Sequence, residues 1–163
     1  MTPPDLPPFA DEGRRPDPAK LARQAQMDHL SQVPLLQACS KRELRRLAQA
    51  TRLELIEAGQ PLIIEGRDSH EAYVVVAGRA TVRRNGRKIA EVGPGDVVGE
   101  LGLILRRQRE STVTADTPLE VLVLERRALR TAVEEVPGLG WKLLETVSDR
   151  MAENASSRRS RRA

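Results

Sequence analysis

The spacing of apolar residues changes twice along the chain. Between residues 18 and 50 they recur three or four positions apart, as Leu44 and Leu47 do in "SKRELRRLAQA". From Arg52 they come in short runs separated by turn residues, and after Arg126 the wider spacing returns. Helices have the first kind of spacing and strands the second. The pattern therefore predicts helices, then short strands, then helices again.

Two helices are expected before the strands. Asp17 followed by Pro18 is a typical helix start. The segment "AKLARQAQMDHL" then places three residues roughly along one helical face: Leu21, Ala25 and Leu30. Ser40 and Glu43 have the spacing of a capping box, which predicts that a second short helix begins there.

The central region is expected to be all strands and turns. Its runs are "RLELIEAG", "PLIIEG", "EAYVVVAG", "RATVRRNGRKIAEV", "GDVVGE", "STVTAD" and "LEVLVLE". Asn85-Gly86 lies between two alternating segments, as in a tight hairpin. Many short strands at this spacing favour a roll over a parallel sheet. The predicted fold class is α+β: an antiparallel, jelly-roll-like β-roll flanked by N-terminal and C-terminal helices, the last two separated at Pro137-Gly138.

Composition narrows the choice of function. Aromatic residues make up only 2% of the chain, which argues against binding nucleic acids by stacking. The net charge is +4, and the last eight residues, "SSRRSRRA", contribute four arginines, so the rest of the chain is balanced. Such a tail is either a solvated end or a contact for anionic surfaces such as RNA, DNA or a membrane.

The predicted division of the chain has four parts. Six of the eleven prolines fall within the first eighteen residues, which predicts a disordered N-terminus over 1–17. A helical lead-in over 18–32, a domain over 33–154 and a disordered, Arg-rich tail over 155–163 follow. No apolar run reaches membrane-spanning length and no secretory signal is present, so the expected location is cytoplasmic.

One stretch carries candidate chemistry: "GDVVGELGLILRRQREST". Glu100 lies inside an apolar run, where a carboxylate is costly to bury unless it meets a partner or a ligand. Elsewhere, His29 and His70 are too few for a metal cluster, and Cys39 is read as a small buried residue. Since no pair of nucleophile and base can be assembled, no enzymatic activity is predicted.

The order of these segments resembles the cyclic nucleotide-binding domains of bacterial regulators and of cyclic-nucleotide-dependent kinases. The resemblance rests on "AGQPLIIEG", "VVVAGRATV" and "VGPGDVVGELGL", with Arg109 nine residues after Glu100 and two helices following. It extends roughly from Val33 to Asn154. In that family the corresponding segment, here residues 99–112, is the phosphate-binding cassette.

The resemblance implies roles for single residues. Arg109 matches the arginine that pairs with the cyclic phosphate, and Glu100 the glutamate that accepts from the ribose 2′-hydroxyl. The backbone N–H groups of Gly102 and Leu103 would face the anion. The implied nucleotide-binding residues are Gly99, Glu100, Leu101, Gly102, Leu103, Arg109, Glu110, Ser111 and Thr112, the ligand is cAMP or cGMP, and no other cofactor or metal is implied. Alternatively, Glu100 and Arg109 neutralise each other across the loop.

Four residues raise questions of their own. Glu110 stands where the family usually has Ala, Ser or Thr, and facing a phosphate from ~5 Å it would oppose binding by about 3 kcal/mol. Strand alternation favours an outward carboxylate instead. Gln108 replaces a common proline. Trp141 could cover the base, but core or dimer packing is the preferred interpretation; Asn154 either contacts the base or faces solvent.

Two functions remain after these considerations. The first is a cyclic nucleotide sensor that rearranges its C-terminal helices toward another protein or a second copy of itself. The second is a degenerate, ligand-free scaffold for protein interaction or dimerisation. Only twelve residues follow Met151, too few for a DNA-binding domain, so a free-standing module is expected.

Overall fold

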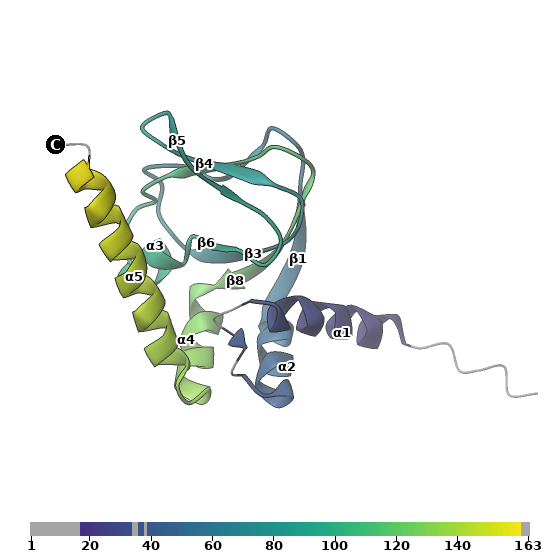
Figure 1. Cartoon of the computed structure of the whole chain (residues 1–163). Helices are drawn as coiled ribbons and strands as arrows, with labels where there is room; N and C mark the ends of the chain where they lie inside the picture. Colours follow the sequence, from purple (N-terminus) through teal and green to yellow (C-terminus); the bar gives the residue numbers. More distant parts are fainter. Residues whose placement is uncertain (1–16, 34–35, 38, 161–163) are drawn as a thin grey trace, which may run out of the picture.

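The computed structural model describes residues 17–33, 36–37 and 39–160. Two four-stranded antiparallel sheets face each other, and the helices lie at one side and below (Figure 1). The helices are α1 (Pro18–Ser31), α2 (Lys41–Ala50), α3 (Glu100–Leu105), α4 (Arg126–Glu135) and α5 (Leu139–Ser160). The strands are β1 (Thr51–Ile56), β2 (Pro61–Ile63), β3 (Glu71–Ala77), β4 (Ala80–Arg84), β5 (Arg87–Val92), β6 (Val97–Val98), β7 (Thr112–Ala115) and β8 (Leu119–Glu125).

The two sheets have the orders β1-β8-β3-β6 and β2-β7-β4-β5. Successive residues of a strand point their side chains to opposite faces of the sheet. Tyr73 and Val75 of β3 therefore pack between the sheets, whereas Val74 packs against the helices together with Leu122 of β8. The first sheet thus carries a core on each face. The predicted α+β class with an antiparallel β-roll is confirmed.

Local signals at the helix starts are confirmed. Asp17 caps α1 by accepting the N–H of Ala19 at 3.0 Å. Ser40 and Glu43 form the reciprocal capping box of α2, with bonds of 3.2 and 2.6 Å. Each bond satisfies an N–H that the helix itself cannot pair.

The three residues expected along one face of α1 are not all buried. Leu30 is buried, but Leu21 is 54% exposed and Ala25 is also exposed. The second buried residue of α1 is Met27. Both buried residues lie in the C-terminal half, since only that half packs against the helical core around α2.

The predicted hairpin is confirmed between β4 and β5. Asn85 and Gly86 have φ angles of +52° and +76°. A two-residue turn that follows the twist of its strands requires positive φ at both positions, which Asn and Gly tolerate best.

The C-terminal helices differ from the prediction in two ways. The break at Pro137-Gly138 is confirmed, but α5 continues to Ser160, so residues 155–160 are helical where a disordered tail was predicted. Trp141 is 71% exposed, so packing in the core of this chain is excluded. Leu139 is buried against α4, and the helix beyond it runs alongside the roll (Figure 1). Residues 1–16 and 161–163 lie outside the described part.

Candidate functional site

The segment 99–112 folds as a strand end, a short helix and a returning loop. Gly99 follows β6 directly and takes a left-handed φ of +83° as the N-cap of α3. The six-residue helix ends at Leu105, and its C-cap Arg106 has a φ of +51°. The loop then leads into β7 at Thr112. The two left-handed residues turn the chain sharply at both ends of α3. This shape brings Arg109 back toward the first turn of α3.

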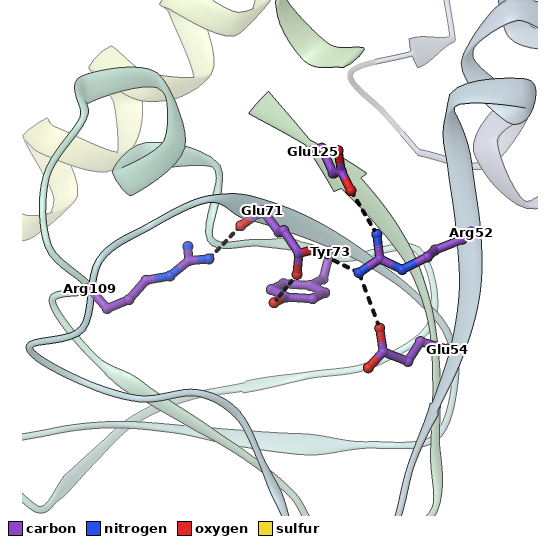
Figure 2. A network of polar contacts seen from close by, with 6 residues as sticks. All are labelled: Arg52, Glu54, Glu71, Tyr73, Arg109 and Glu125. Carbon is purple, nitrogen blue, oxygen red and sulfur yellow. Dashed lines mark hydrogen bonds and ion pairs between the residues drawn. The ribbon is translucent and has the colours of Figure 1, made fainter. Parts of the chain in front are cut away.

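Arg109 is held inside the fold by backbone groups. Its guanidinium Nη1 donates to the Gly99 carbonyl at 2.9 Å, and Nη2 donates to the Glu71 carbonyl (Figure 2). Its Cζ lies 6.0 Å from the centre of the Tyr73 ring, within cation–π range. The residue is only 9% exposed. The side chain that the sequence assigned to the phosphate is therefore fixed before any ligand arrives.

The backbone of Arg109 is pinned as well. Its N–H donates to the Arg67 carbonyl at 2.8 Å, and its own carbonyl accepts the N–H of Gly66 at 2.8 Å. Further along, the Thr112 hydroxyl oxygen accepts the N–H of Glu65 at 3.0 Å. The returning loop is thus tied to the β2–β3 connection.

Glu100 lies beside Arg109 in the interior. It is the first residue of α3 and is 3% exposed. Burial lowers the pKa of Arg109, while the charges of Glu71 and Glu100 oppose that shift. Arginine stays protonated under all ordinary conditions, so the site holds a buried cation and a buried carboxyl group together. The two residues therefore lie close enough for their charges to interact.

Gly99 allows this arrangement because it has no side chain. A Cβ at this position would lie 2.5 Å from Nη1 of Arg109 and 3.0 Å from Cδ1 of Ile63. Real Cβ atoms do not approach other atoms so closely, and the positive φ also disfavours any other residue. Gly99 is required on both grounds.

Gly102 makes a similar close approach to a residue that the sequence did not single out. A Cβ there would lie 2.8 Å from Oγ and 3.1 Å from Cβ of Ser69. Ser69 is buried, and its hydroxyl has no hydrogen-bond partner among the described residues. Its carbonyl accepts from Nη2 of Arg126 at 2.6 Å, and Nε of Arg126 donates to the Leu103 carbonyl at 3.2 Å. Arg126 thereby joins α3 to the start of α4.

Gly102→Ala is expected to destabilise the protein by about 1–2 kcal/mol, or roughly 2–8 °C in Tm, because the added methyl group overpacks the contact with Ser69. In a Ser69→Gly background, where both close atoms are removed, the same substitution should be nearly neutral. Thermal unfolding of the four proteins of this double-mutant cycle measures the difference. Equal losses in both backgrounds would contradict the proposed contact.

The prediction for the backbone of Leu103 is wrong. Its N–H donates to the Gly99 carbonyl at 3.3 Å, because α3 begins one residue after Gly99 and this is its first intrahelical bond. The N–H is therefore used within the helix instead of facing an anion. The side chain of Leu103 is fully buried, and that of Leu101 lies outside the described part of the structure. Ser111 is half-buried beside Thr112.

Glu110 faces away from the interior. Its carboxylate is 48% exposed and lies 3.5 Å from Nη2 of Arg84 and 3.7 Å from Nη1 of Arg107. The Glu110 carbonyl also accepts from Nε of Arg84 at 3.3 Å. Arg109 is buried and Glu110 is exposed, so the two side chains point to opposite sides. The outward carboxylate was expected because Glu110 would begin a strand, but β7 begins only at Thr112, so strand alternation is not the reason for it. Gln108 is exposed as well.

Several residues at the site were missed by the sequence analysis. Ser69, Glu71 and Tyr73 surround Arg109 and α3, and Arg126 connects them to α4. Glu71 and Tyr73 did leave a signal, since two polar groups two residues apart on a strand share one face. The bond between Glu71 and Arg52, which lies on another strand, has no signal in the sequence.

The other candidate residues stay apart from the site. No group of three metal-ligating side chains exists within the described ranges, so His29 and His70 form no cluster there. Burial raises the pKa of the half-buried Cys39 thiol, and the charge of Glu43 adds to the effect, so the reactive thiolate is disfavoured. The side chain of Asn154 falls outside the described part. Within the same part, no helix is long and apolar enough to cross a membrane.

Comparison with known proteins decides the family. The family model of the cyclic nucleotide-binding domain matches residues 53–136, which includes the whole segment 99–112. The chain belongs to the cyclic nucleotide-binding domain family. The matched residues lie within the predicted domain over 33–154, whose exact limits stay a prediction.

Relatives of this cyclic nucleotide-binding domain include kinase subunits. A cAMP-dependent protein kinase regulatory subunit of Eremothecium gossypii is 37% identical over 98 residues, which is 60% of this chain and 21% of the relative. The chain thus spans about a fifth of that curated relative's length. The regulatory domain of Toxoplasma gondii PKA with cAMP matches with a TM-score of 0.67 at 25% identity, over 85% of this chain and 51% of that one. The regulatory subunit of a cAMP-independent protein kinase A from Trypanosoma brucei matches with a TM-score of 0.70 at 25% identity, over 80% and 48%.

Proposed function

We propose that this chain is a sensor that binds cAMP or cGMP through residues 99–112. The observation that supports this most strongly is the buried guanidinium of Arg109, held by two carbonyl groups beside Glu100. The two carbonyl bonds use two of the five N–H donors of an arginine, and the planar fork matches phosphate oxygens. Glu100 supplies the acceptor for a ribose hydroxyl.

The proposed output is a rearrangement of α4 and α5 toward a partner protein. Arg126 supports this, because it bonds the carbonyls of Leu103 in α3 and of Ser69 while it forms the first turn of α4. The kinase regulatory subunits among the relatives favour another protein as partner, and a second copy of this chain is the alternative. Regulatory domains of this family are generally non-catalytic, so no enzymatic activity is proposed. A cytoplasmic location and contact of the Arg-rich tail with anionic surfaces stay predictions.

A ligand-free scaffold is the second candidate. It is favoured by the likeness to a regulatory subunit described as cAMP-independent, which shares this fold. The acidic residue directly after the anchor arginine, Glu110, is a second argument for the scaffold. Its carboxylate, however, pairs with Arg84 and Arg107 at the surface, which favours the sensor.

Glu110→Ala separates the two candidates. In a sensor, the wild type should bind cAMP or cGMP, and the substitution should change Kd by less than about threefold, because a solvated, paired charge acts weakly on the site. Glu91→Ala, which removes another exposed and ion-paired glutamate outside residues 99–112, is the matched control. Isothermal titration gives Kd for all three proteins. If the wild type binds neither nucleotide and the Glu110→Ala protein binds one, the wild-type chain is a ligand-free scaffold.

A further inference from the structure

Glu71 is engaged through both its backbone and its side chain (Figure 2). Its carbonyl accepts from the Arg109 guanidinium. Its carboxylate accepts from Nη2 of Arg52 at 2.7 Å and from the Tyr73 hydroxyl at 2.9 Å. One residue thus connects the anchor arginine to two further side chains.

The sheet register brings these side chains together. Val123 of β8 is paired with Arg52 of β1 on one side and with Tyr73 of β3 on the other. Residues directly opposite in an antiparallel sheet point to the same face. Arg52 and Tyr73 therefore share a row, and Glu71, two residues before Tyr73, lies on the same face. The contacts follow from the strand pairing.

The charges fit the observed bonds. Arg52 also lies 3.1 Å from Glu125 and 3.7 Å from Glu54, so three carboxylates surround it. Burial on its own would raise the pKa of Glu71, but the hydrogen bonds from Arg52 and Tyr73 outweigh it and lower that pKa. Burial, and then the bond to Glu71, raises the pKa of Tyr73 to about 12. At neutral pH the carboxylate is ionised and the hydroxyl keeps its proton, as both bonds require.

We propose that Arg52, Glu71 and Tyr73 are positioning residues for Arg109. Arg52 and the Tyr73 hydroxyl hold the Glu71 carboxylate, which fixes the peptide whose carbonyl accepts from Arg109. The guanidinium of Arg109 lies over the face of the Tyr73 ring, which limits its movement on that side. The network acts on the nucleotide through Arg109 and rests on the proposed function of that residue. Preorganising a binding group lowers the entropy lost when ligand binds, so loosening the network weakens binding.

Two substitutions loosen the network at opposite ends. Arg52→Gln removes the cation that holds Glu71, and Tyr73→Phe removes only the hydroxyl and keeps the ring. Each is expected to raise Kd for the bound cyclic nucleotide about three- to tenfold, the size of one or two lost hydrogen bonds. Arg52→Lys, which keeps a charge but not the fork, should recover part of the loss. Arg46→Gln is the matched control, because it breaks a surface ion pair with Glu135 at 2.9 Å.

A second measurement needs no ligand. The Nε–Hε resonance of Arg109, identified by its absence from Arg109→Lys, reports the surroundings of the guanidinium in the free protein. It should shift in Arg52→Gln and Tyr73→Phe and stay in place in Arg46→Gln. An unmoved resonance in both test variants would overturn the proposal, whatever happens to Kd. If the wild type binds neither cAMP nor cGMP, the proposed function fails, and the resonance alone still decides whether the network positions Arg109.

Discussion

Arg109→Lys is expected to raise Kd for cAMP or cGMP roughly 10- to 100-fold, about 1.4–2.7 kcal/mol, and to leave the fold intact. The guanidinium of Arg109 donates to the carbonyls of Gly99 and Glu71 from two different nitrogens. A single ammonium cannot hold both carbonyls and also present paired N–H groups to a phosphate. The charge is kept, so the expected loss comes from geometry.

Arg107→Lys is the control for that substitution. Arg107 is exposed and lies 3.7 Å from Glu110, two residues from the anchor. Its substitution should leave Kd unchanged within about twofold, as for surface charges in general. Titration calorimetry gives both values, and circular dichroism checks the fold. Equal affinities of the wild type and Arg109→Lys would contradict the assignment of Arg109 as the residue that binds the phosphate.

Gly99→Ala is expected to have two effects. The left-handed φ of +83° costs about 1–2 kcal/mol of stability for a residue with a side chain. The added Cβ also lies 2.5 Å from Nη1 of Arg109, so the guanidinium has to move and nucleotide binding should weaken at least about tenfold. Thermal unfolding measures the first effect and titration the second.

Gly59→Ala isolates the backbone cost. Gly59 has nearly the same φ, +84°, and an added Cβ there would meet nothing within 4 Å. This variant should lose a similar amount of stability and keep the affinity of the wild type. If Gly99→Ala binds the nucleotide as tightly as Gly59→Ala does, the contact between Gly99 and Arg109 does not control binding.

Features that depend on neighbouring residues were predictable from the sequence. The capping box at Ser40 and Glu43 and the turn at Asn85-Gly86 are set within a few residues, and both are present. The segment 99–112 was also recognisable, because its glycines and its arginine are spaced along one continuous stretch. Its helix and the burial of Arg109 agree with that interpretation.

Features that depend on strand pairing or on helix packing were not predictable. Arg52 reaches Glu71 only because β8 lies between β1 and β3 in register, which no local pattern encodes. Arg84 meets Glu110 across 26 positions of the chain in the same way. The first bond of α3 depends on where that helix begins, and this is why the N–H of Leu103 was misassigned. The extension of α5 to Ser160 was not predicted because residues 155–160, "ASSRRS", have no apolar spacing that indicates a helix.

Isothermal titration of the wild-type protein with cAMP and with cGMP tests the central claim most directly. We expect saturable binding of at least one of them with one site per chain. We expect no comparable binding of 5′-AMP, which lacks the cyclic phosphate that Arg109 is proposed to bind. The same titration of Arg109→Lys should show the binding strongly weakened. If the wild type binds neither cyclic nucleotide, the proposed sensor function is wrong, and the chain keeps the fold of the family without its ligand.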